Sequence, residues 1–203
     1  MIKKRDFKGF QINGDKLSHW SALLKHWHLL IKHYCVLMED DMDAPYYYTE
    51  RANTGVLAGA AWKAGWIALQ EFSARKRAKK IGFPDLWICS SNREMDEYIE
   101  VKQAWSLTRA NDGLTLAVKD ARKIRVNKES MRIGLLFISP SIHEKYESEI
   151  DNKIKEAISL IKQIKCDAIA WSFPAISRMY RGSGRAKHYI YPGILLLAKV
   201  ADQ

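Results

Sequence analysis

The chain has 203 residues, enough for one domain with a sizeable core and too few to make two domains the expectation. Its 33 lysine and arginine residues outnumber its 23 aspartate and glutamate residues, and the formal net charge of +10 favours a polyanionic partner. No apolar run approaches the roughly 18 residues of a membrane span, and three widely spaced cysteines argue against a disulfide framework or a CxxC metal site. We therefore expect a cytoplasmic protein without a membrane partner.

Apolar residues at three- and four-residue steps predict a helix over residues 15–38. Three histidines follow it at seven-residue intervals: His19, His26 and His33. Two helical turns separate neighbours by about 10.5 Å, too far to share one metal ion, so we interpret this stripe as a helix face or an interface. The acidic run 39–43 predicts a linker that ends the helix. Residues 1–45 are thus expected as an N-terminal helical extension, and residues 46–203 as the main domain.

A long helix is predicted over residues 49–78, where Gly65 can introduce a kink. Thr49 can cap this helix, and Glu50 then lies in the first turn, where the helix dipole favours a carboxylate. Five cations crowd its other end: Arg75, Lys76, Arg77, Lys79 and Lys80. Such a run is typical of a solvated helix end, and it can also bind backbone phosphates in a salt-sensitive way.

Two antiparallel strands are predicted over residues 83–89 and 97–103, joined by a polar turn. Alternation along a strand places Glu100 and Lys102 on one face. Asp85 is near the start of the partner strand and can converge with them. Two carboxylates and an ammonium group suit hydrolysis of a phosphodiester with the help of a hard cation. The competing interpretation is a surface hairpin whose exposed Glu–Lys pair contributes less than about 1 kcal/mol.

Pro84-Asp85, followed after fourteen residues by Glu100-Val101-Lys102, resembles the signature of the PD-(D/E)xK nucleases. This resemblance implies a restriction-endonuclease-like fold and a Mg²⁺ ion, with Mn²⁺ as an alternative. It implies that Asp85 and Glu100 are metal ligands, that the Val101 carbonyl can be a third, and that Lys102 orients or activates the attacking water.

The same resemblance extends to the preceding helix. Many members of the family carry a further glutamate there, and the spacing of Glu50-Arg51, Leu57 and Gly65 is loosely similar to the archaeal Holliday-junction resolvases. The resemblance implies that Glu50 supports the metal, with Glu71 as a competitor for this role. Gln103 can contact the water or the phosphate.

The rest of the chain predicts further strands and helices in alternation. We expect a helix over 114–126, a strand over 131–138, a helix over 141–165, a strand over 166–171, and a closing hairpin or edge strand over 189–198. This order predicts a single α/β domain with a central mixed β-sheet flanked by helices.

The segment 177–188 contains no acidic residue. We expect it to be a basic loop that can hold a nucleic-acid backbone and stack on an unpaired base, although cations in such a loop can also serve solubility alone. The residues involved are Arg178, Tyr180, Arg181, Arg185 and Lys187.

Together these features predict a Mg²⁺-dependent endodeoxyribonuclease that cuts DNA at a specific structure or sequence. RNA as substrate and a homodimer remain open. The alternative is a nuclease-like module that binds nucleic acid without cleaving it, and a third possibility is a structural protein whose charge serves solubility. Only the first two predict salt-sensitive DNA binding.

Overall fold

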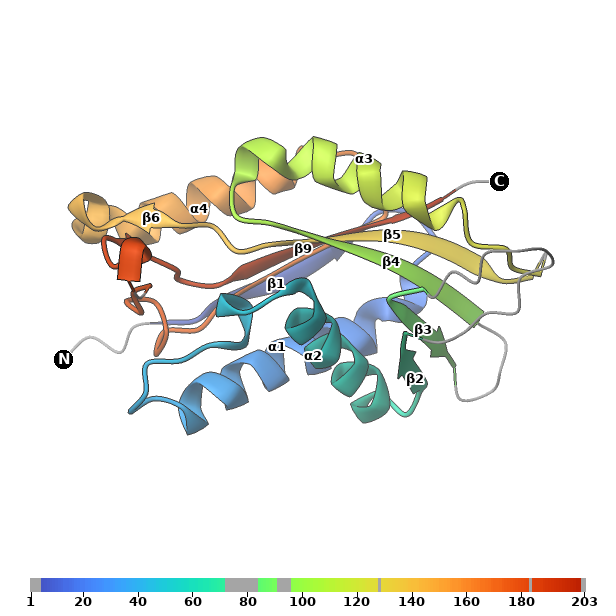
Figure 1. Ribbon diagram of the computed structural model, residues 1–203, viewed down its shortest axis with the longest axis horizontal. Helices are drawn as coiled ribbons and strands as arrows, with labels where there is room; N and C mark the ends of the chain where they lie inside the picture. The colour runs from blue at the N-terminus through green and yellow to red at the C-terminus, as the bar shows by residue number, and fades with distance from the viewer. Residues whose placement is uncertain (1–4, 72–83, 91–95, 128, 183, 202–203) are drawn as a thin grey trace.

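The computed structural model describes residues 5–71, 84–90, 96–127, 129–182 and 184–201. Seven strands form its central sheet: β1 Phe7–Ile12, β2 Ile67–Gln70, β3 Leu86–Cys89, β4 Asp96–Ala104, β5 Met131–Ile138, β7 Ala168–Phe173 and β9 Ile194–Val200. Their order is β1-β7-β9-β5-β4-β3-β2 (Figure 1). The pairing of β4 with β5 is parallel and the other five are antiparallel. A separate ribbon pairs β6 Ile142–His143 with β8 Tyr189–Ile190.

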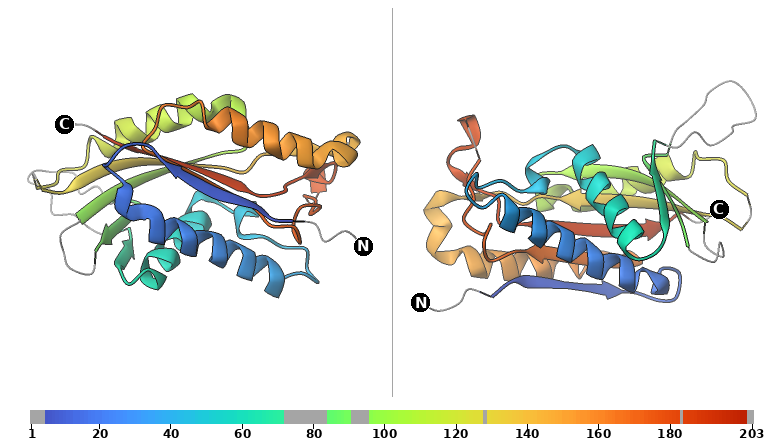
Figure 2. Two further views of the ribbon diagram at one scale, coloured as in Figure 1. Left: turned by 180° about the vertical axis from the view of Figure 1, so that it is seen from behind. Right: turned by 90° about the horizontal axis from the view of Figure 1, so that it is seen from below.

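Helices cover both faces of this sheet. Helices α1 Ser21–Leu37 and α2 Glu50–Lys63 lie on one face, and α3 Ala110–Ala121 and α4 Ile150–Ile161 lie on the other (Figures 1 and 2). Each helix buries an apolar stripe, as α4 does with side chains three or four residues apart: Ile150, Ile154, Ala157 and Ile161. The predicted α/β class with a mixed sheet flanked by helices is confirmed.

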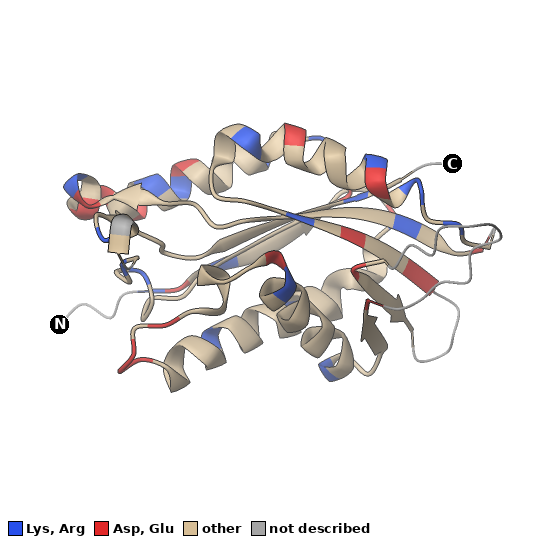
Figure 3. Cartoon of the chain, viewed as in Figure 1, with Lys and Arg blue, Asp and Glu red and all other residues tan. Residues whose placement is uncertain are grey.

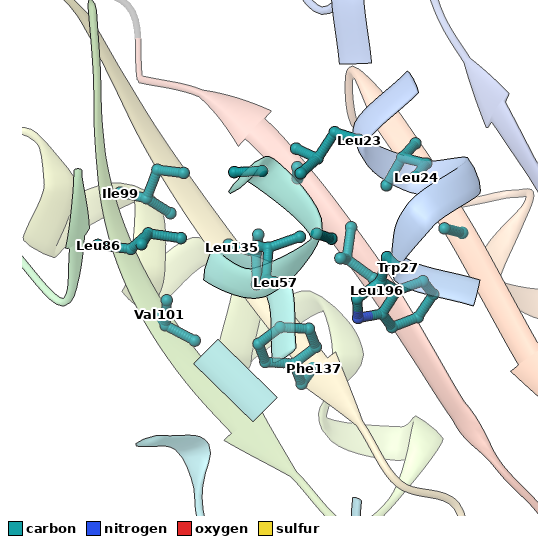
Figure 4. Close-up of a cluster of buried hydrophobic side chains, with 14 of the residues drawn as sticks. Leu23, Leu24, Trp27, Leu57, Leu86, Ile99, Val101, Leu135, Phe137 and Leu196 are labelled. Atoms are coloured by element: carbon teal, nitrogen blue, oxygen red, sulfur yellow. The ribbon is translucent and has the colours of Figure 1, made fainter. Parts of the chain in front are cut away.

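The larger core lies between the sheet and helices α1 and α2 (Figure 4). Its centre is formed by side chains that are at most 1% exposed: Leu23, Leu24, Trp27, Leu57, Leu86, Ile99, Val101, Leu135, Phe137 and Leu196. Because side chains alternate along a strand, burying Ile99 and Val101 here directs Glu100 and Lys102 to the opposite face of β4. The core therefore sets the direction of the polar side chains on this strand.

Helix α3 forms the crossover that the parallel strands β4 and β5 require. It lies very close to the sheet at Gly134, where an added Cβ atom would be 2.3 Å from the backbone nitrogen of Val118. Gly134 is opposite Glu100 in the strand register. A glycine at this position thus lets α3 approach the part of β4 that carries the polar residues.

The N-terminal segment differs from the expected helical extension. Strand β1 pairs with β7 along its whole length, and α1 contributes to the larger core, so residues 7–37 belong to the same layers as the rest of the chain. The helix predicted over 15–38 is present as α1, preceded by a 3₁₀ turn at Ser18–Trp20. The sequence does not predict β1, because its six residues alternate poorly between apolar and polar positions.

The helix predicted over 49–78 is wrong beyond Lys63. Gly65 adopts a φ of +82°, and Trp66 donates a backbone hydrogen bond to Ala61, an arrangement that ends a helix. The chain then forms β2, which pairs with β3 at the edge of the sheet. The last part of the predicted helix, from residue 72, lies outside the described residues.

Two other boundaries also differ. The helix expected over 141–165 is preceded by β6 and a 3₁₀ segment, Glu144–Glu149, so that only residues 150–161 are α-helical. The expected closing hairpin or edge strand is wrong in its position, since β9 lies between β7 and β5 in the interior of the sheet. Its nearly continuous apolar sequence is typical of a strand buried on both faces. None of the described helices is long and apolar enough to cross a membrane.

Candidate active site at the open edge of β4

The candidate site lies where β3 ends and β4 continues. The last residue pair between these strands is Leu86 with Ile99, whereas β4 stays paired to β5 as far as Ala104. Within the described part of the chain, residues 100–104 of β4 therefore have no strand partner on the β3 side, and we call this stretch the open edge of β4. Continuing the register by one residue places Asp85 opposite Glu100, and side chains opposite each other in antiparallel strands share a face.

Carboxylates occupy the hydrogen-bonding positions along this open edge. Asp85 Oδ2 accepts a hydrogen bond from the backbone nitrogen of Val101 at 2.7 Å. Two residues along, the backbone of Gln103 is close enough to the Glu50 carboxylate at the start of α2 to favour its ionised form and so to oppose the rise in its pKa that burial causes. In a strand the N–H and C=O groups of one residue point to the same side, so the Val101 carbonyl also faces this edge. Two side chains thus take the place of a neighbouring strand.

The carboxylates are close enough to disturb one another's ionisation. Burial raises the pKa of Glu100 to about 7, and the charge of Asp85 and a hydrogen bond with it act in the same direction. Burial and the charge of Asp85 also raise the pKa of Glu50. Lys102 opposes both shifts. A further positive charge here would relieve the repulsion that remains between the carboxylates.

Lys102 lies on the same face of β4 as Glu100 (Figure 3 shows acidic and basic positions along this strand). Its Nζ atom is 3.3 Å from Asp120 Oδ2 on α3. Burial disfavours the charge on Lys102, but the hydrogen bond with Asp120 and the nearby charge of Glu50 outweigh it and raise the pKa of the ammonium group. Lys102 therefore stays protonated at neutral pH.

Asp120 is a member of the site that the sequence did not indicate. It also binds Lys123 at 2.6 Å, and this hydrogen bond, followed by the one with Lys102, lowers the pKa of its carboxyl group. Asp120 reaches Lys102 only because α3 packs closely on the sheet at Gly134. On the sequence it is one acid among the charged residues of a surface helix, and no local signal distinguishes it.

Gln103 contacts the segment around the start of α2. Its Nε2 atom donates to the Tyr48 carbonyl at 3.0 Å, and its Oε1 atom accepts from Asn53 at 3.4 Å. Each end of the amide thus makes one hydrogen bond within the protein and keeps a second hydrogen-bonding position, so a contact with water or phosphate stays a prediction. Gln103 connects β4 to the start of α2 and so positions Glu50.

Glu50 and Glu71 both line a cavity of about 170 Å³ that Asp85 also borders. Glu50 is in the first turn of α2, as expected. Glu71, the competitor, follows β2 with a φ of +50° and is not on a helix. It forms an ion pair with Arg51, and its side chain is 59% exposed. The helix glutamate beside Asp85 is therefore Glu50.

The donor set fits a hard cation better than a transition metal. Within the described ranges, no three His, Cys, Asp or Glu side chains are grouped closely enough to hold a metal. Mg²⁺ does not need such a cage, because it keeps several waters and is usually held by one or two carboxylates. Asp85 and Glu100 are the two neighbouring carboxylates that could serve in this way.

The basic segment contradicts the expectation of a binding loop at two positions. Arg178 is 1% exposed and donates to Asp151 at 2.9 Å, and Tyr180 is 5% exposed with its hydroxyl directed at the Cys35 carbonyl. Neither side chain is available to a nucleic acid. Arg178 lies over the ring of Phe7 on β1, and Tyr180 contacts Cys35 on α1.

The other predicted binding residues lie at the surface or outside the described part. Arg181 forms ion pairs with Glu144 and Glu147, and Lys187 is exposed. Nothing is described for the Arg185 side chain, and the run formed by Arg75, Lys76, Arg77, Lys79 and Lys80 lies outside the described residues.

The first histidine of the predicted stripe does not lie on helix α1. His19 precedes α1, and its Nε2 atom is 2.5 Å from Oε1 of the buried Glu97 on β4. Trp20 donates to both oxygens of the same carboxylate. His19 thus belongs to a structural contact between the N-terminal segment and the sheet.

Comparison with protein-family models gives no match for this sequence, and comparisons with curated proteins and with solved structures give none either. The chemistry of the site is therefore inferred from its own residues.

Proposed function

We propose that the protein is a metal-dependent nuclease of the PD-(D/E)xK kind, an endodeoxyribonuclease that hydrolyses DNA phosphodiester bonds at a specific structure or sequence. The observation that carries this proposal is the convergence of Asp85, Glu100 and Lys102 at the open edge of β4, with a pKa of about 7 for Glu100. Two competing carboxylates beside a lysine are costly in a surface hairpin and useful at a cation site.

The order of elements supports the same proposal. Helix α2, strands β2, β3 and β4, the crossover helix α3 and strand β5 follow one another along the chain, with β4 and β5 parallel. This arrangement brings the aspartate at the start of β3 next to the Glu-x-Lys of β4, and it places a glutamate from the preceding helix beside both. The PD-(D/E)xK resemblance implies the same relation.

Each side chain then has a defined part in hydrolysis. Asp85 and Glu100 would hold Mg²⁺, and Glu50 would bind one of its waters. A bound Mg²⁺ supplies a Lewis acid that lowers the pKa of water and stabilises charge on the phosphate. Lys102 keeps its proton because its pKa is raised, so it acts as a fixed cation that orients the water and the phosphate. Asp120 positions Lys102.

The test uses purified protein and four DNA substrates: duplex, single strand, flap and four-way junction. We expect cleavage with Mg²⁺ or Mn²⁺ that is lost on chelation and depends on Lys102. Calorimetric titration with Mg²⁺ should show binding that is lost in Glu100→Gln. Salt-sensitive DNA binding without cleavage or metal binding would support the binding module instead. The absence of both binding and cleavage would contradict any nucleic-acid function.

A further inference from the structure

A groove of about 700 Å³ lies beside the candidate active site. Four aromatic side chains line it: Tyr47, Tyr48, Trp105 and Tyr191. Two of them are joined directly to the elements of the site. Trp105 follows the last residue of β4, and the Tyr48 carbonyl accepts the hydrogen bond from Gln103 that connects β4 to α2. One side of the groove therefore adjoins the end of β4 and the start of α2, the two elements that carry Lys102 and Glu50.

The aromatic rings of the groove hold one another in fixed orientations. The rings of Trp105 and Tyr191 are 6.1 Å apart and nearly perpendicular, at 88°, and those of Tyr47 and Tyr191 are 5.7 Å apart at 71°. Edge-to-face contacts of this kind are favourable and limit side-chain motion. Trp105 nonetheless stays 45% exposed and Tyr48 49% exposed. The groove thus presents rigid, accessible aromatic surface.

The charges at the groove argue against a phosphate as its occupant. Among the described lining residues, Arg181 is the one lysine or arginine, and its guanidinium is paired with Glu144 and Glu147. Asp41 and Asp43 also line the groove. An anionic backbone would gain little here, so the groove suits an uncharged, flat group.

A cation is the other common guest of aromatic walls, and one of the two carboxylates at the groove is already engaged within the protein. Asp43 Oδ2 accepts hydrogen bonds at 2.7 Å from the hydroxyls of Tyr34 and Tyr48, and Asp43 Oδ1 accepts from the backbone of Ala44. Its capacity is largely used to hold Tyr48 in place.

We propose that this groove binds an unpaired nucleobase of the substrate by stacking, next to the bond that the Asp85–Lys102 site cleaves. The inference rests on the proposed nuclease function and narrows the substrate to DNA with unpaired nucleotides, such as a flap, a bulge or a single strand. Trp105 is three residues beyond Lys102, about 10 Å along the extended chain. The alternation of side chains places Lys102 toward α3 and Trp105, like Gln103, toward α2, so the bound strand would have to pass around the open edge of β4 between the two. A paired base would first have to leave the duplex.

The test measures DNA binding with Ca²⁺ in place of Mg²⁺, using a fluorescein-labelled 12-nucleotide single strand and the corresponding duplex. Trp105→Ala should weaken single-strand binding by about 5- to 100-fold, the effect of losing one stacked base, and duplex binding by less than about twofold. Trp105→Phe should retain most of the affinity. Trp62→Ala is the matched control, because Trp62 is 55% exposed and lies outside the groove; it should change neither affinity.

A series of single strands, each with one abasic nucleotide at a different position, locates the base. An abasic nucleotide at one of these positions should weaken binding to the wild type and leave binding to Trp105→Ala unchanged. The inference is overturned if the wild type cleaves DNA while Trp105→Ala binds the single strand as the wild type does, an outcome that leaves the proposed function intact. It is also overturned if tetramethylammonium binds the groove and the single strand does not. Failure of the wild type to bind or cleave any DNA would remove both the function and the inference.

Discussion

The open edge of β4 and the basic segment 177–188 are both rich in charged side chains, but the fold treats them differently. At the open edge, Asp85, Glu100 and Lys102 remain partly exposed and face one another. In the basic segment, Arg178 is buried against Asp151 and Arg181 is held by two glutamates. The first arrangement leaves opposing charges incompletely balanced, and the second balances them within the protein.

The difference comes from the regularity of the backbone. A strand has a period of two, so burying Ile99 and Val101 is enough to determine where Glu100 and Lys102 point. An irregular segment has no such period, and its composition alone does not determine which cations reach solvent. Charge at a strand edge is therefore informative about a site in a way that charge in a loop is not.

The largest expected effect is a loss of cleavage activity on substitution at the open edge of β4. Lys102→Ala should lower the cleavage rate by about 10²- to 10³-fold, because the fixed cation beside the phosphate is lost. Lys123→Ala is the matched control, since Lys123 binds the same Asp120 carboxylate but its side chain is 66% exposed. We expect less than a threefold change for the control in a single-turnover assay. Equal losses in both variants would show that Asp120, and not Lys102, is what the reaction needs.

The next effect concerns stability in the basic segment. Arg178→Ala should lower the free energy of unfolding by roughly 2 to 4 kcal/mol, because the buried guanidinium binds Asp151 and the Arg5 carbonyl and lies over the ring of Phe7. Denaturant unfolding provides the measurement, and Lys187→Ala, at an exposed position, should change it by less than about 0.5 kcal/mol. If Arg178→Ala kept its stability and instead lost DNA affinity, the contrast between the two regions would be wrong.

The regular elements were also the predictable ones in the rest of the chain. The ribbon formed by β3 and β4 followed from two short apolar runs, and α1 followed from its helical spacing. Strand β2 was missed, because the apolar residues on both sides of Gly65 continue a helical pattern that only the positive φ of this glycine ends. Residues that act through tertiary contact left no local signal either: Asp120 reaches the site through a close approach of α3 to the sheet.

A smaller effect is expected in how the free energy of unfolding depends on pH, because the charges at the open edge of β4 are not balanced. The pKa of Glu100 is raised to about 7 from an ordinary value of 4.5, so the folded state binds this proton more tightly than the unfolded chain. The stability that protonation provides is fully present below about pH 4.5 and is lost as the pH rises through about 7. Because the group is partly exposed to screening solvent, we expect a loss on the order of 1 kcal/mol.

Glu100→Gln should therefore raise the free energy of unfolding by about 1 kcal/mol at pH 8 and leave it nearly unchanged at pH 4.5. Mg²⁺ should stabilise the wild type at pH 8 and not the variant, because binding to the folded state depends on the ionised carboxylate. Thermal unfolding at the two pH values, with and without Mg²⁺, measures both effects. A variant that is less stable than the wild type at pH 8 would show that Glu100 forms a favourable contact and is not in a strained pair.

The smallest expected effect asks whether paired cations contribute to DNA binding. The logarithm of the binding constant K for duplex DNA falls linearly with the logarithm of the salt concentration. Removing one cation that contacts a phosphate makes this slope shallower by about 0.9. Arg181 is shared by Glu144 and Glu147, so we expect Arg181→Ala to change this slope by less than about 0.3. Glu144→Gln and Glu147→Gln together should release the guanidinium and make the slope steeper. A full unit lost in Arg181→Ala alone would mean that DNA displaces both glutamates, and the basic segment would then join the open edge of β4 as a binding surface.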